Sequence, residues 1–239
     1  MRAIKFLHDF IGELPAPIRQ EIISKSTEQT FSRNAVIYAQ GDEPSHMYQL
    51  LKGRVKLCNF SVDGREVVTG EFLKGDCFGE MGLIDGLPRV SHAIATEHCM
   101  VRVIRKTDFD QLIERFPEFS RQVMVILCRR LRYAYGLRIE ASGLTLHEQL
   151  AIQLCRLGIS QGSVDEHGDL FVSISQEELA RRIGASRQSI NKELKRLVNE
   201  GDVELRYGKI YLVNLHTMQE KFQHLLGEEQ ITPMYQQDF

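Results

Sequence analysis

Two residues of opposite charge, Glu80 and Arg89, lie in a mostly apolar and glycine-rich stretch, FGEMGLIDGLPRVSHA, at residues 78–93. Apolar neighbours do not compensate a charge, so a carboxylate and a guanidinium placed there each require a partner. The two side chains can pair with each other as a salt bridge, or they can bind one polar ligand together. The chemistry of this stretch is therefore either an internal ion pair or a ligand site.

A second group of residues with a defined chemistry lies in SISQEELARRIGASRQSINKELKRL, residues 173–197. Ser175 and Glu178 are three positions apart, which is the spacing of a capping box at a helix start. Gly184 permits a tight turn, after which Ser186 can cap a second helix. The pattern predicts a helix-turn-helix. The apolar positions that would bury one face of the second helix are Ile190, Leu194, Leu197 and Val198.

The other face of this second helix carries long hydrogen-bonding side chains, namely Arg187, Gln188, Asn191, Lys192 and Lys195. Base edges in the major groove of DNA present donor and acceptor patterns that Arg, Gln and Asn can distinguish. Residues 181–209 contain eight Lys or Arg and four Asp or Glu, although the whole chain has a net charge of −2. This segment therefore has a positive surface to offer, although composition alone would fit a solvated helix with an accidental basic face. The capped pair of helices followed by a wing is what favours DNA binding.

The segment that must position the first stretch has the texture of a β-domain. Across residues 30–105, short apolar segments are separated by glycines at positions 41, 53, 64, 75 and 86, a spacing of eleven or twelve residues. Turn signals at such regular intervals are typical of a compact sandwich or barrel. Asp63-Gly64 predicts a type I′ hairpin turn between strands at residues 54–60 and 65–72.

Residues 120–143, SRQVMVILCRRLRYAYGLRIEASG, predict a long helix with a coiled-coil-like seam. The seam consists of Val123, Leu127, Ala134, Leu137 and Ala141. Such a seam can pack on the β-domain of its own chain, but a stripe of this length in 239 residues favours a second copy of the chain as the partner. Ser142-Gly143 then breaks the helix, which predicts a hinge.

The remainder of the chain continues with a helix at residues 144–157, a polar loop, a short strand at residues 170–174, the two helices described above and a hairpin around Tyr207-Gly208. This order of elements is that of a winged helix-turn-helix. From His216 onward the sequence is polar and predicts one or two amphipathic turns followed by a loose tail.

Composition restricts the class of protein further. The five cysteines are widely spaced without a CxxC pair, which fits reduced thiols in the cytoplasm and argues against a metal or iron–sulfur centre. The longest apolar run, residues 123–127, is too short to span a membrane, and the N-terminus lacks the pattern of a signal peptide. No nucleophile–base set, HExxH motif or Walker loop is present, so we do not expect an enzyme.

Together these features resemble the CRP/FNR (cyclic-AMP receptor protein) family of bacterial transcription regulators over nearly the whole chain. The resemblance is most specific at GEMGLIDGLPRVSHA and at ASRQSINKELKRL. It implies an α+β fold whose parts are a jelly-roll-like cyclic-nucleotide-binding β-roll at residues 1–116, a dimerisation helix and hinge at residues 117–143, a winged helix-turn-helix DNA-binding domain at residues 144–216, and a tail at residues 217–239.

The first motif is similar to the phosphate-binding cassette of cyclic-nucleotide-binding domains, which implies a cyclic nucleotide as effector. Glu80 would accept a hydrogen bond from the ribose hydroxyl, while Arg89 and backbone amides after Gly79 would bind the phosphate. Gly79 and Gly82 would leave the approach open. The ligand-binding set that the resemblance implies is Gly79, Glu80, Arg89, Val90, Ser91, Ala134 and Tyr135.

The motif departs from relatives that respond to cyclic AMP at two places. Those relatives have Arg-Ser at the end of the cassette, whereas Val90 separates Arg89 from Ser91 here. They also place Thr-Ser of the long helix against the adenine, where this chain has Ala134 and Tyr135. A tyrosine can stack on a purine or donate its hydroxyl, so the effector can be cyclic AMP or a cyclic nucleotide with another base.

The resemblance also implies the partners. The DNA-binding set comprises Ser175, Gln176, Ser186, Arg187, Gln188, Ser189, Asn191, Lys192 and Lys195. The implied partners are double-stranded DNA with an inverted-repeat operator, a second copy of the chain through the long helix, and RNA polymerase, with no membrane.

These observations lead to one principal hypothesis and two alternatives. The principal one is a homodimeric transcription regulator in which the effector shifts the hinge and reorients two recognition helices. One alternative is a DNA-binding regulator whose pocket is degenerate or holds a different ligand. The other is a cyclic-nucleotide module that regulates a partner enzyme, which would have no use for the winged helix.

Overall fold

The fold is described from a computed structural model, in which the described residues are 2–5, 7–64, 66–225 and 231–235. The chain forms two compact units. We call residues 6–128 the roll unit, and residues 129–239 together with 1–5 the C-terminal unit. Within the described ranges, every helix is too short or too polar to traverse a membrane.

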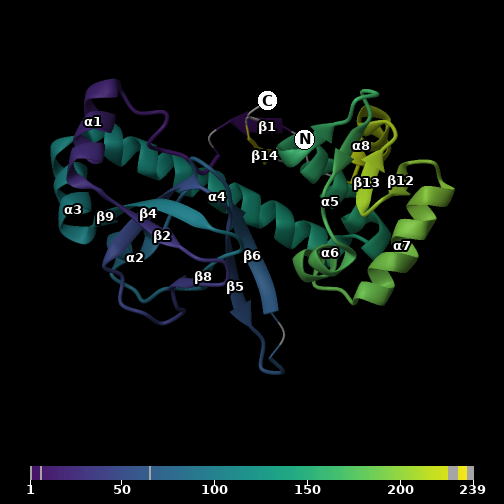
Figure 1. The fold of residues 1–239 in the computed structure, drawn as a ribbon, viewed down its shortest axis with the longest axis horizontal. Helices are drawn as coiled ribbons and strands as arrows, with labels where there is room; N and C mark the ends of the chain where they lie inside the picture. Colours follow the sequence, from purple (N-terminus) through teal and green to yellow (C-terminus); the bar gives the residue numbers. More distant parts are fainter. Residues whose placement is uncertain (1, 6, 65, 226–230, 236–239) are drawn as a thin grey trace. The chain divides into compact units, whose positions relative to one another are not determined.

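The roll unit is built on two antiparallel four-stranded sheets, with strand orders β2-β9-β4-β7 and β3-β8-β5-β6 (Figure 1). Their inner faces share one core, in which Leu50 and Val101 of the first sheet pack with Val55 and Ala93 of the second. The strands are β2 (Thr27–Phe31), β3 (Val36–Tyr38), β4 (His46–Lys52), β5 (Val55–Phe60), β6 (Glu66–Phe72), β7 (Cys77–Phe78), β8 (His92–Ala95) and β9 (Cys99–Arg105). The predicted β-roll is confirmed.

Helices of the roll unit pack into a second core on the outside of one sheet. Phe119 is central to it, because its ring meets those of Phe10 and Phe109 edge to face at 5.5 Å. Met47 of β4 faces this core, whereas its neighbour Tyr48 faces the core between the sheets, as strand alternation requires. The helices are α1 (Ala16–Lys25), α2 (Met81–Asp85), α3 (Lys106–Arg115) and the start of α4 (Pro117–Gly143).

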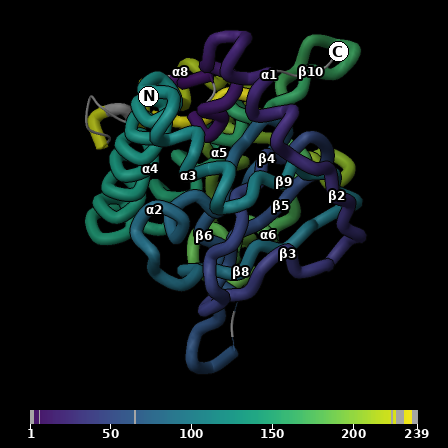
Figure 2. Tube along the Cα trace, turned by 90° about the vertical axis from the view of Figure 1, so that its left-hand side faces the viewer, coloured from purple at the N-terminus to yellow at the C-terminus, as the bar shows by residue number. Residues whose placement is uncertain are grey.

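The β5–β6 hairpin forms as expected, but its turn is not the predicted type I′. A type I′ turn needs positive φ at both central residues. Of the two central residues here, Gly64 has a positive φ, at +77°, and Asp63 does not. The amide of Gly64 instead donates to the carbonyl oxygen of Ser61 at 2.8 Å, so the strands are joined by a longer loop. Figures 1 and 2 show this loop at the far end of the hairpin.

The long helix α4 forms, but its exposed seam differs from the predicted one. Val123 of the predicted seam is buried in the helical core of the roll unit, and Leu127 is half-buried beside that core. The exposed apolar stripe is shifted by about one residue and consists of Met124, Cys128, Leu131, Tyr135 and Ile139. Apolar periodicity alone could not tell which side of the helix its own chain covers. We call these five residues the α4 stripe.

The C-terminal unit contains the predicted winged helix-turn-helix. Its sheet has the order β10-β11-β13-β12, and Tyr207 and Gly208 join β12 to β13 with φ values of +48° and +77°. Two consecutive positive φ values are the signature of a type I′ turn. The elements are α5 (Leu146–Gln161), β10 (Ser163–Val164), β11 (Leu170–Val172), α6 (Gln176–Ile183), α7 (Arg187–Asn199), β12 (Val203–Arg206), β13 (Lys209–Leu212) and α8 (Leu215–Gln223).

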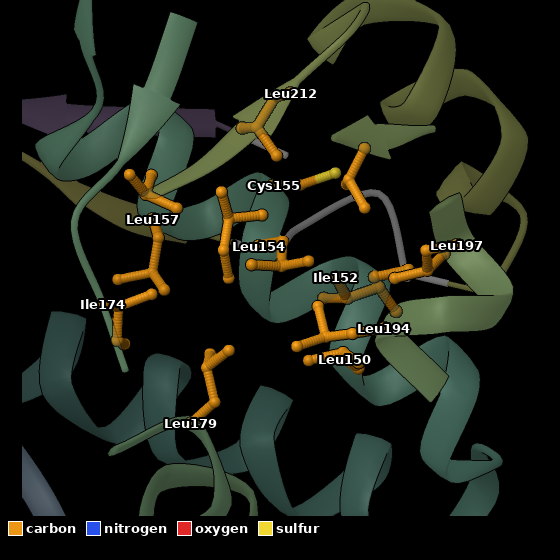
Figure 3. Packing of buried hydrophobic residues seen from close by; sticks show 14 of the residues in the cluster. Leu150, Ile152, Leu154, Cys155, Leu157, Ile174, Leu179, Leu194, Leu197 and Leu212 are labelled. Atoms are coloured by element: carbon orange, nitrogen blue, oxygen red, sulfur yellow. The ribbon is translucent and has the colours of Figure 1, made fainter. Parts of the chain in front are cut away.

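The core of this unit is centred on α5, as Figure 3 shows. Leu150 and Leu154 of α5 are fully buried and pack with Leu194 and Leu197 of α7. Burying a leucine side chain contributes about 1.5–3 kcal/mol, so these contacts fix α7 on α5. The opposite face of α7 is thereby turned to solvent.

The tail differs from the prediction of a loose segment. Residues Ile231–Met234 form strand β14, which pairs in parallel with β1 (Arg2–Lys5). Ile231 and Thr232 are buried, and the amide of Tyr235 donates to the carbonyl oxygen of Ser160 in α5 at 3.3 Å. Polar composition concealed this strand because its stability comes from pairing with the other end of the chain.

Candidate functional site

The first motif folds as a strand, a one-turn helix and a loop. After β7, Gly79 takes a φ of +85°, and α2 follows directly with Glu80 as its N-cap. Gly86 ends α2 in the left-handed conformation, and its amide donates to the carbonyl oxygen of Gly82 at 3.0 Å. Both positive φ values suit glycine because other residues reach them only with strain.

Gly82 serves packing and not the approach of a ligand, which corrects the expectation from the sequence. A Cβ at Gly82 would lie 2.6 Å from the carbonyl oxygen of Leu87 and 2.7 Å from Pro44 Cβ. Gly79 is also closely packed, because a Cβ there would lie 3.1 Å from Nη1 of Arg89 and 3.3 Å from the carbonyl oxygen of His46. The missing side chain at Gly79 therefore lets the guanidinium lie against the backbone of the cassette.

Arg89 is only 6% exposed, and its guanidinium has no carboxylate partner among the described residues. Nη1 donates to the carbonyl oxygen of Gly79, Nη2 donates to that of His46, and Cζ lies 4.4 Å from the centre of the Tyr38 ring. Nε is buried without an acceptor within the described ranges. Glu80 and Arg89 thus do not form the internal salt bridge that the sequence left open.

The other predicted residues of the cassette are close to Arg89 in the sequence, but they differ in how far they are buried. Glu80 is 1% exposed, Ser91 is buried and Val90 is exposed. Asn59 of β5 donates through Nδ2 to the carbonyl oxygen of Val90 at 3.1 Å. Lys106 of α3 donates through Nζ to the carbonyl oxygen of Leu83 in α2 at 3.0 Å. The sequence motif did not reveal Asn59 or Lys106, which hold the cassette from other elements.

Aromatic rings line the interior next to Arg89. The ring of Tyr38 lies 5.9 Å from that of Tyr48, which stacks on Phe78 at 5.2 Å, and Phe78 stacks on Phe72 at 5.4 Å. An aromatic face beside a guanidinium attracts the positive charge and offsets part of the cost of burying it. Sequence reasoning missed these residues because they lie on four different strands.

Ala134 and Tyr135, the last two residues of the predicted ligand set, belong to the C-terminal unit. Both are exposed on α4, and Tyr135 is part of the α4 stripe. Their contact with a nucleotide base stays a prediction.

The helix-turn-helix is built by the predicted caps. The hydroxyl oxygen of Ser175 accepts from the amide of Glu178 at 3.1 Å, and that of Ser186 accepts from the amide of Ser189 at 3.0 Å. The carboxylate of Glu178 binds Arg182 at 3.1 Å. A complete reciprocal capping box lies instead at the start of α5, between Thr145 and Glu148.

Helix α7 presents its polar residues as the sequence predicted, with one exception on its apolar face. Ile190, Leu194 and Leu197 are buried, but Val198 is 37% exposed. The DNA-binding candidates Ser175, Ser186, Arg187, Gln188, Lys192 and Lys195 are exposed, and Gln176, Ser189 and Asn191 are half-buried.

The cations of this surface fall into two groups. Arg182 and Arg196 form ion pairs with Glu178 and Glu200. Arg187, Lys192 and Lys195 have neither an ion pair nor a side-chain hydrogen bond to any residue that the structure describes. Unpaired cations on the exposed face of a capped helix are available to phosphates and base edges.

Comparison with known proteins matches both parts of the chain. Residues 28–116 match the cyclic nucleotide-binding domain, and residues 148–221 match the Crp-like helix-turn-helix domain. A CRP-like cAMP-activated global transcriptional regulator from Mycobacterium tuberculosis is 32% identical over 187 residues, which cover 77% of this chain and 82% of that protein. The chain belongs to the CRP/FNR family.

Other members of the CRP/FNR family resemble the chain to a similar extent. The cyclic AMP receptor protein of Thermus thermophilus is 30% identical, over 79% of this chain and 84% of that protein. The solved structure of CLP, a c-di-GMP responsive global regulator from Xanthomonas campestris, has a TM-score of 0.69 at 22% identity and covers 84% of this chain and all of that one. The chain is thus a CRP-like transcription regulator and not an enzyme, with a cyclic-nucleotide-binding domain and a helix-turn-helix.

Proposed function

We propose that this regulator is a homodimer whose binding to DNA is controlled by a cyclic nucleotide held in the roll unit at Gly79, Glu80, Arg89, Val90 and Ser91. The observation that carries the proposal is the burial of Arg89 without a carboxylate partner among the described residues. A buried cation that meets only carbonyl oxygens and a ring gains most from an anionic ligand.

The two charged residues of the cassette have complementary roles in this proposal. Arg89 has an Nε–H that meets no acceptor within the described ranges, and each Nη retains a second hydrogen, so it can bind phosphate oxygens without giving up its carbonyl contacts. Glu80 can accept from a sugar hydroxyl of the same ligand. Gly79 lets the guanidinium lie against the backbone of the cassette, because a side chain there would press on Nη1 of Arg89.

The base of the effector is the less determined part of the proposal. Relatives and structural neighbours include proteins described as cAMP-activated and as c-di-GMP responsive. We propose that Tyr135, an aromatic residue on α4, contacts the base beside Ala134 and permits a choice other than adenine. Titration calorimetry with cyclic AMP, cyclic GMP and cyclic di-GMP identifies the base.

The α4 stripe supports a dimer. Met124, Cys128, Leu131 and Tyr135 follow one another at spacings of four, three and four residues, which is the alternation of core positions in a two-stranded coiled coil. All four are exposed in the single chain. An exposed apolar seam of this length is stabilised by pairing with a second copy.

We expect oxidation to cross-link two chains through Cys128. Core positions of a parallel two-stranded coiled coil bring identical residues opposite each other, within reach of a disulfide. Treatment with a mild oxidant should give a covalent dimer on a non-reducing gel, and Cys128→Ser should abolish it. The other four cysteines are buried and serve as internal controls. A cross-link that persists in Cys128→Ser, or a monomer by light scattering, would contradict the dimer.

We expect the affinity for operator DNA to depend on the effector. A ligand that binds the DNA-competent state more tightly shifts the population toward it, and a 100-fold preference raises the affinity by up to about 100-fold. A gel shift of promoter DNA with and without the cyclic nucleotide that binds in calorimetry measures this. Equal DNA affinity in both arms would favour a regulator whose pocket is not used for control by a cyclic mononucleotide or dinucleotide.

A further inference from the structure

Strand β4 brings a histidine to the same face of the roll as Arg89. His46 and Tyr48 are alternate residues of β4, so their side chains leave the same face of the strand. The centres of these two rings lie 6.4 Å apart, and the ring centre of Tyr48 lies 5.9 Å from that of Tyr38. The guanidinium of Arg89 lies over the ring of Tyr38. The carbonyl oxygen of His46 itself accepts from Arg89. His46 thus contacts the guanidinium through its backbone, and its imidazole lies beside the ring of Tyr48.

One of the two ring nitrogens of His46 forms a hydrogen bond. Nδ1 lies 2.8 Å from the hydroxyl oxygen of Ser45, and Nε2 has no hydrogen-bond partner among the described residues. The residue is half-buried, so part of its surface is open to solvent. Tyr48 is 7% exposed, and burial raises the pKa of its phenol, which therefore stays neutral beside His46.

The charged groups that act on His46 are cations. Burial lowers the pKa of His46, and the positive charges of Arg89 and Arg105 lower it further. Arg105 is the cross-strand partner of His46 on β9 and is itself paired with Asp108 at 2.9 Å. Arg89 has no such carboxylate within the described ranges, so its charge acts on His46 uncompensated.

We infer that His46 is a second, proton-dependent donor to the anionic effector, so that binding of a phosphate at Arg89 is accompanied by proton uptake on His46. This inference rests on the proposed effector site. An anion on Arg89 removes the repulsion between the two cationic groups, and an imidazolium at Nε2 can donate to another oxygen of the same phosphate. Neither sequence motif pointed to His46, which lies on a strand outside the cassette.

The direction of the pH dependence follows from this linkage. A bound anion raises the pKa of His46 above its value in the free protein. The affinity for effector is therefore greatest below the pKa of the free protein and falls as the pH rises through the pKa of the complex. A phosphodiester keeps its single negative charge throughout this range. The pH dependence of the affinity must therefore come from a titrating group of the protein.

The experiment is calorimetric titration of the full chain with cyclic AMP and with cyclic di-GMP, at about pH 6 and about pH 8, on either side of the usual histidine range. We expect binding to be about three- to tenfold tighter at the lower pH, since one unit of pKa shift corresponds to a tenfold change. His46→Gln should flatten this dependence. His98→Gln, which removes an exposed imidazole from the same unit, should preserve it.

A second measurement needs no variant. The binding enthalpy of the unaltered protein, measured in two buffers of different ionisation enthalpy, should reveal uptake of up to one proton. If neither nucleotide binds at either pH, the effector site and the role of His46 both fail. If a nucleotide binds without proton uptake, or if His46→Gln retains the pH dependence, only the role of His46 is overturned.

Discussion

Replacement of Arg89 by Ala should abolish measurable binding of the cyclic nucleotide while the roll unit stays folded. Removing one partner of a buried, hydrogen-bonded charge pair costs about 2–5 kcal/mol, or roughly 30- to 4,000-fold in affinity. Arg89 is the basic residue of the cassette and is 6% exposed, so solvent would screen its contact with the ligand only weakly. Titration calorimetry of the purified variant measures the loss.

Two further variants separate charge from geometry. Arg89→Lys keeps the positive charge but not the fork that reaches Gly79, His46 and the ligand together, so we expect it to recover only a small part of the affinity. Arg33→Ala removes an exposed arginine from the same unit and should bind as the unaltered chain does. Thermal unfolding monitors the fold of each variant. An unchanged affinity in Arg89→Ala would show that the ligand lies elsewhere.

The sequence motif identified the two charged residues of the cassette but not the groups that surround them. Glu80 and Arg89 were identified because charges stand out in an apolar segment, and both are buried. Their contact with a ligand stays a prediction. The groups that hold the guanidinium were not predictable, because His46 and Tyr38 lie 43 and 51 residues earlier in the chain. Local spacing carries no information on which strands meet across a β-roll.

The fold, too, was predictable where its signals are local and not where distant segments meet. Strand and helix types followed from glycine spacing and apolar periodicity, which are local signals. The α4 stripe was predicted about one residue out of place because α4 is apolar on more than one side, and burial of Val123 in the roll unit decides which side remains exposed. The pairing of β1 with β14 joins the two ends of the chain and has no local signal at all.

For DNA recognition, the decisive local feature is the position of Arg187. It is the first residue of α7, directly after the Ser186 cap, and it is exposed. The first turn of a recognition helix enters the major groove deepest, and arginine reads guanine there through O6 and N7. Two α7 helices related by a dimer axis require an inverted repeat with half-sites about one helical turn apart.

Arg187→Ala should weaken binding to the operator by about 1–3 kcal/mol per half-site, because each bidentate contact to guanine is lost. It should also relax the preference for that guanine. Selection from a random DNA library, followed by sequencing, measures both effects. Gln188 can pair with adenine or accept from cytosine through its amide oxygen, so we expect the neighbouring base pair to remain selective in this variant.

Lys195→Ala provides the matched control, since Lys195 is also an exposed cation on α7 but lies two turns further along the helix. If it touches phosphate, its loss should weaken all DNA sequences alike and flatten the salt dependence, leaving the base preference unchanged. The two variants therefore separate base reading from charge attraction on one helix. A winning sequence without inverted symmetry, or a guanine preference that survives Arg187→Ala, would contradict this orientation of α7.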